Sequence, residues 1–288
     1  MEPRPCNACG GAHAPGPCPG SQNETPEHLR LPGAPVELPL LRSYEQALGL
    51  QWPITYSIDY SGKLDRLRVL SFSREHAIQL TLNSYIEPEK NKDMMVHELC
   101  HAALAERIDP AFASALFLKK YRELKGEEEK KFSQATREFY LAWCHIDLWV
   151  DALRDSLWPE LTQQGHKSFV QAMQGLARAG ERDAFRQPDN IIAMALNSLE
   201  GKKYGFPPFN IKKALGKETG EEVARPVRLL SQYYESLPPL SYNREEDLAL
   251  LQRSVQGAAA VLKRVGILPK LIQPTIQAEE GRYVWSLD

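Results

Sequence analysis

The sequence contains no long hydrophobic run and no strong excess of charge of either sign. None of its apolar segments approaches the roughly 20 residues that a membrane-spanning helix needs. The formal net charge is −2 over 288 residues, so no overall positive field attracts nucleic acid or a membrane surface. The first residues carry prolines and a cysteine where a secretory signal has an apolar stretch. These absences predict a cytoplasmic protein with neither a membrane nor a nucleic acid as its partner.

Cysteine is scarce and unevenly placed. There are five cysteines, an odd number that excludes a complete set of disulfide pairs. Three of them, Cys6, Cys9 and Cys18, fall in the first 18 residues. With His13 they form the pattern Cys-x2-Cys-x3-His-x4-Cys, which offers a complete set of ligands for a structural zinc ion.

This N-terminal pattern resembles a CCHC zinc knuckle, with one residue fewer than usual between Cys9 and His13. Knuckles that grip single-stranded nucleic acid carry an aromatic residue for base stacking and basic residues nearby. The first 20 residues have no aromatic residue, and Arg4 is their one basic side chain. We therefore expect a structural zinc without nucleic-acid binding; an arm with free thiols is the alternative.

The rest of the chain predicts an α+β core followed by a mainly helical region. Apolar residues alternate in three segments, which predicts strands at 53–60, 67–72 and 76–83. Helical spacing predicts helices at 92–107, with Asp93 as its cap, at 112–131 and at 132–157. The expected organisation is a zinc knuckle and linker (1–35), a core (36–164) and a mainly helical C-terminal region (165–288) that ends in a short strand.

The segment with the clearest chemistry is His97-Glu98-Leu99-Cys100-His101. Residues four apart lie on one face of a helix, so the two imidazoles can share a tetrahedral zinc ion. Glu98 projects beside that metal and can transfer a proton. Apolar neighbours predict a buried helix, in which these polar side chains are costly unless a metal or hydrogen bonds satisfy them. The alternative is a core helix without metal.

The run from Met94 to Ala102 resembles the active-site helix of zincin metallopeptidases, and its H-E-L-C-H-A sequence is similar to that of SprT-like proteases. The resemblance covers residues 53–158. It implies a zincin-like fold, in which a small twisted sheet packs on this helix and its edge strand binds a peptide substrate. It also implies a zinc-dependent hydrolase that cleaves peptide bonds with a metal-activated water, with Glu98 as the catalytic base and with His97 and His101 as metal ligands.

A third ligand is needed, and no histidine lies between His101 and His145. Asp147 and Asp151 are one helical turn apart in the segment 132–157. They resemble the acidic pair of other zincins, in which the first carboxylate binds metal and the second holds a ligating histidine. The resemblance implies these two roles for Asp147 and Asp151. A three-histidine site with His145, or Asp151 as ligand with Asp155 behind it, are alternatives.

Other candidates and functions stay open. Cys100 is expected to be a small buried core residue, with a thiolate on zinc as the alternative. Tyr233, Tyr234 and Tyr242 could stabilise an oxyanion, but no spacing selects one of them and core packing is the favoured explanation. A catalytically silent scaffold of the same fold, which binds a protein partner through its C-terminal helices, is the second hypothesis. A nucleic-acid-associated protease recruited by the knuckle is the third.

Overall fold

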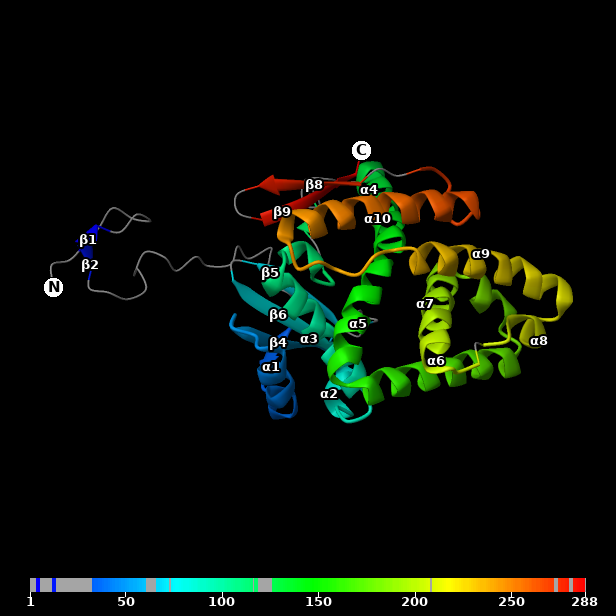
Figure 1. Ribbon diagram of the computed structural model, residues 1–288, viewed down its shortest axis with the longest axis horizontal. Coiled ribbons are helices and arrows are strands. Elements are labelled where there is room, and N and C mark those ends of the chain that lie inside the picture. The colour runs from blue at the N-terminus through cyan, green and yellow to red at the C-terminus, as the bar shows by residue number, and fades with distance from the viewer. Residues whose placement is uncertain are drawn as a thin grey trace.

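The chain is a mixed α+β protein in which a small sheet lies beside a larger set of helices (Figure 1). The computed structural model describes residues 4–5, 12–13, 33–60, 66–72, 74–115, 117–118, 126–207, 209–271, 274–279 and 282–287. None of the helices in these ranges combines the length and the apolar character that crossing a membrane requires.

The four-stranded sheet supports the candidate site. Its order is β3 (Ala34–Val36), β4 (Ile54–Asp59), β6 (Glu75–Thr81) and β5 (Arg68–Phe72). The pair β4–β6 is parallel and the other two pairs are antiparallel. Strand β5 stands at one end of the order and is therefore an edge strand. The three predicted strands are confirmed. The sequence analysis missed β3, which has three residues and is mostly exposed, so it shows no hydrophobic alternation.

The helix α3 (Lys92–Arg107) packs on this sheet and matches the predicted range. Its side chains are buried nearly all round, and Met95 and Leu99 belong to the same core cluster as Val69 and Ile78 of the sheet. The predicted cap is wrong: Asp93 lies in the first turn and the helix begins after Asn91. Short helices border this unit: η2 (Pro39–Leu41), α1 (Arg42–Leu48) and α2 (Leu82–Ile86).

The next stretch departs from the two helices predicted at 112–131 and 132–157. It contains the turn η3 (Pro110–Phe112), β7 (Phe117–Leu118), α4 (Glu127–Trp143), the turn η4 (Cys144–Ile146) and α5 (Asp147–Leu157). The ring of His145 bonds to the carbonyl of Ala142 at this turn. The turn η4 separates the two helices, and Asp147 is the first residue of α5.

The C-terminal region is mainly helical, as predicted. Its helices are α6 (Pro159–Ala179), η5 (Arg182–Arg186), α7 (Pro188–Tyr204), α8 (Ile211–Leu215), α9 (Lys217–Glu235) and α10 (Arg244–Arg264). The helix α6 runs continuously through residues 164 and 165, where the sequence analysis sets a boundary. Figure 1 shows α5 between the sheet and these helices, in contact with both α3 and α6.

Two further pairings lie near the chain ends. The hairpin β8 (Pro274–Glu279) and β9 (Arg282–Leu287) is extended by β7, which pairs parallel to β9. The predicted closing strand is β9. At the other end, β1 (Arg4–Pro5) pairs with β2 (Ala12–His13). The knuckle cysteines Cys6, Cys9 and Cys18 and the side chain of His13 lie outside the described residues, so that zinc site stays a prediction.

Candidate metal centre

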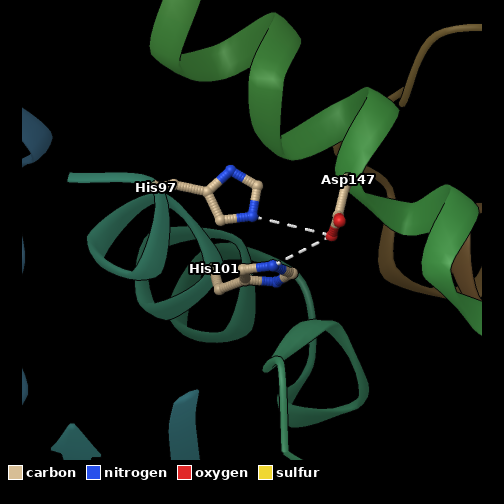
Figure 2. Close-up of side chains that lie close together, drawn as sticks. All are labelled: His97, His101 and Asp147. Carbon is tan, nitrogen blue, oxygen red and sulfur yellow. Dashed lines mark ion pairs between the residues drawn. The ribbon is translucent and has the colours of Figure 1, made fainter. Parts of the chain in front are cut away.

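Three predicted ligands meet between α3 and α5. Figure 2 shows the imidazoles of His97 and His101 turned toward one carboxylate, that of Asp147. The distance from Asp147 Oδ1 is 3.6 Å to His97 Nε2 and 3.3 Å to His101 Nε2. One ligand atom from each of the three residues lies within 4.8 Å of the others. Asp147 is the first residue of α5, directly after η4, and the first turn of α5 faces the histidine pair.

These distances fit a tetrahedral zinc ion. Ligand atoms about 2.0–2.1 Å from such an ion lie about 3.3–3.4 Å from one another. The two measured nitrogen–oxygen distances, 3.6 and 3.3 Å, fall close to that value. Two imidazoles and one carboxylate form a known donor set for catalytic zinc, and three protein ligands leave a fourth position for water or substrate.

A hydrogen bond at the Nδ1 atom of each histidine fixes the orientation of its ring. His97 Nδ1 lies 2.9 Å from Asp151 Oδ1, and His101 Nδ1 lies 2.8 Å from the backbone carbonyl of Phe112. A carbonyl accepts but never donates, so His101 carries a proton on Nδ1, and a metal that replaced the proton on Nε2 would meet a lone pair directed at the centre. Asp151 holds His97 in the same way. The geometry therefore gives Asp151 the supporting position that the resemblance implies for it.

The electrostatics of the cluster favour a positive charge at its centre. Burial opposes ionisation of Asp147, but hydrogen bonds from His101 and His97 outweigh it and hold its pKa below the usual range. Burial likewise opposes protonation of His97, but Asp151 and Asp147 outweigh it and raise its pKa above 6.5. Two carboxylates thus attract a cation to a site where the imidazoles offer lone pairs, and a metal that binds there displaces a proton.

Glu98 lies beside the centre and is held by a residue that the sequence analysis missed. Its Oε2 accepts a hydrogen bond of 2.5 Å from the hydroxyl of Ser114. The same hydroxyl oxygen accepts the backbone N–H of Val69 at 2.7 Å, which ties Glu98 to the edge strand β5. Ser114 lies 16 residues after Glu98, beyond a turn, so no local spacing marks it.

A cleft of about 440 Å³ opens onto the cluster. It is lined by the three predicted ligands, by Glu98 and by Asp151, so these polar groups share one accessible space. The sequence analysis did not assign the other lining residues to the site: Arg66, Leu67, Arg68, Met94, Ser114, Ala115, Tyr140, Trp143, Cys144 and Arg154. The lining side chains outside this set that carry hydrogen-bond donors include those of Arg66, Arg68, Ser114, Tyr140, Trp143 and Arg154.

The remaining candidates lie elsewhere. Cys100 is buried, and this burial raises its pKa to about 12, so it remains a protonated core thiol. Tyr233 donates its hydroxyl hydrogen bond to the Ser254 carbonyl, Tyr234 is buried in the core, and Tyr242 is exposed. None of these three tyrosines lines the cleft.

His145 is placed away from the cluster, in the core. Its Nδ1 lies 2.9 Å from the carbonyl of Ala142, and its Nε2 lies 2.7 Å from the hydroxyl of Ser254. Both ring nitrogens are therefore engaged, and the side chain is fully buried. Burial is the main cause that lowers its pKa to about 4.

The low pKa of His145 predicts a loss of stability in acid. The unfolded chain takes up this proton near pH 6.5 and the folded chain only near pH 4, so stability is intact above pH 6.5 and is lost as the pH falls toward 4. The full loss is about 3 kcal/mol. Urea unfolding of the wild type and of His145→Gln, in chelator, measures it. The wild type should lose about 3 kcal/mol more than the variant between pH 7 and 4; parallel curves would contradict the assignment.

Comparison of the chain with models of protein families, with curated proteins and with solved structures gives no match in any of the three. The function therefore has to be argued from the geometry of this centre and its cleft.

Proposed function

We propose that this protein is a zinc-dependent metallopeptidase with a zincin-like core, in which His97, His101 and Asp147 hold the metal. One observation carries the proposal. Two Nε2 atoms from adjacent turns of α3 converge on one oxygen of Asp147, at 3.6 and 3.3 Å, beside a buried glutamate in an open cleft. Convergence of two imidazoles and an acid from a second helix on one point, with an open side toward the cleft, is the arrangement that a catalytic zinc needs.

The arrangement of the sheet supports the zincin-like interpretation. The helix α3 packs on a small mixed sheet whose edge strand β5 borders the cleft through Arg68, and the preceding residue Leu67 also lines it. Val69 N–H and C=O are already bonded to Ser114 and Ala115. A substrate chain that adds to this edge would therefore pair upstream of Val69, next to the metal ligands.

Each residue of the site has a separate role in the proposed peptide hydrolysis. Zinc bound here supplies Lewis-acid chemistry, which acidifies water and polarises a carbonyl oxygen. Glu98, held by Ser114 at the edge of the centre, accepts the proton from the attacking water and passes it to the leaving amine. Asp151 and the Phe112 carbonyl keep both imidazole rings aligned throughout, so no ligand has to reorient during turnover.

Peptide cleavage under metal control tests the proposal. The full chain, loaded with one equivalent of zinc, is incubated with a mixture of peptides, and new termini are identified by mass spectrometry. We expect cleavage that 1,10-phenanthroline abolishes, that added zinc restores, and that the non-chelating 1,7-phenanthroline leaves unchanged. The double variant Cys6→Ser/Cys9→Ser controls for zinc at the N-terminus. A protein that binds zinc at the centre but cleaves nothing would support the scaffold hypothesis instead.

A further inference from the structure

A buried arginine lies next to Asp151, on the side of the candidate metal centre away from the ligand atoms. Arg154 lies on α5 three residues after Asp151, and its side chain is only 7% exposed. Its Nη2 lies 2.9 Å from Asp151 Oδ1. The same carboxylate oxygen lies 2.9 Å from His97 Nδ1. One oxygen atom therefore links the guanidinium to a ring that we assign to the metal.

Stability alone does not explain this arginine. Its other contacts are long: Nη1 lies 3.4 Å from the carbonyl of Asp93, and Nη2 lies 3.8 Å from Glu200 Oε1. Its buried Nε has no hydrogen-bond partner within the described part of the chain. Desolvating a guanidinium costs several kcal/mol, and apolar substitutes for a buried ion pair are often equally stable or more so. The position of the guanidinium points to a task at the carboxylate it touches.

The distances show which acid Arg154 serves. Its Nη2 lies 2.9 Å from Asp151 Oδ1 and 3.8 Å from Glu200 Oε1. The guanidinium is thus paired directly with Asp151, and Glu200 completes the pocket around it.

We propose that Arg154 is a positioning residue of the metal centre. Its ion pair holds the Asp151 carboxylate in one orientation, and Asp151 in turn holds the His97 ring with Nε2 directed at the metal. This inference rests on the proposed metal centre. It adds a residue from outside the segment His97–His101 and the pair Asp147 and Asp151. It also connects the centre to α7, which carries Glu200, so that the helical region contributes to the order of the site.

A double-mutant cycle on zinc affinity tests the proposal. Affinity is measured by competition with a fluorescent chelator in the Cys6→Ser/Cys9→Ser background, for Arg154→Met, Asp151→Asn and the combination. Loss of an outer partner of a ligand typically weakens metal binding 10–100-fold, and we expect about 10-fold for Arg154→Met. Because Arg154 acts through Asp151, the combined variant should bind no more weakly than Asp151→Asn.

Two further variants separate positioning from a general effect on folding. Arg154→Lys keeps the charge and should recover part of the affinity. Arg186→Met removes an exposed arginine that lies outside the cleft lining and should change nothing. Urea unfolding of the metal-free proteins reports stability. Wild-type affinity in Arg154→Met, or losses that add in the combined variant, would overturn the proposal. Absence of zinc at the centre of the wild type would instead remove the metal site itself.

Discussion

Replacing Glu98 with glutamine should abolish peptide cleavage while zinc binding is retained. A positioned acid–base group contributes about 10²–10⁴-fold to a reaction rate, which corresponds to about 3–5 kcal/mol of transition-state stabilisation. We expect kcat/KM to fall by that factor in Glu98→Gln. Zinc affinity should stay at the wild-type value, because Glu98 is not a member of the ligand cluster.

The surroundings of Glu98 allow this substitution without a change in the shape of the site. The side chain is buried, and its Oε2 accepts from the hydroxyl of Ser114 at 2.5 Å. The amide oxygen of glutamine can accept the same hydrogen bond, so the shape of the site and the link to β5 through Val69 are preserved. What is lost is the capacity to take up a proton. A fall in the rate therefore reports acid–base chemistry and not a collapsed cleft.

An exposed acid provides the matched control. Glu160 lies in the first turn of α6, outside the cleft lining, and Glu160→Gln makes the same chemical change at the surface. This control should cleave peptides as the wild type does. Cleavage by Glu98→Gln at the wild-type rate, with zinc bound, would rule out the proposed proton transfer.

The parts of the site that the sequence predicts are those set by local spacing. The range of α3 follows from helical periodicity over 16 residues, and the face shared by His97 and His101 follows from their separation by four. The choice of Asp147 and Asp151 also comes from a one-turn separation. The structure brings both to the histidine pair, and it places His145 in the core with both ring nitrogens engaged.

Contacts between distant segments could not be predicted. Ser114 reaches Glu98 only because η3 turns the chain back after α3. The pairing of Arg154 with Asp151 is a local one that the helical spacing allows, but the approach of Glu200 from α7 depends on the fold. The turn η4 interrupts the helix predicted at 132–157 at a place where the sequence has neither glycine nor proline. Strands β3 and β7 are too short for a hydrophobic period, and each forms through a partner far along the chain.

Removal of the carboxylate that faces both imidazoles should have the largest effect on metal binding. Because loss of an outer partner costs about 10–100-fold in affinity, loss of a direct ligand should cost more than about 100-fold, which we expect for Asp147→Ala. Asp151→Ala should fall within the 10–100-fold range. His145→Gln should bind zinc as the wild type does, since both of its ring nitrogens are engaged in the core.

The order of affinities distinguishes the three candidates for the third ligand, Asp147, Asp151 and His145. Each candidate, if it is the ligand, predicts that its own variant binds zinc most weakly. Affinities are measured by chelator competition in the Cys6→Ser/Cys9→Ser background. Asp183→Asn serves as the control, because Asp183 is exposed, pairs with Arg186 and lies outside the cleft lining. If Asp151→Ala were the weakest binder, Asp151 would be the ligand and Asp147 its neighbour. Equal affinity in all four variants would mean that the zinc ion is held somewhere other than between α3 and α5.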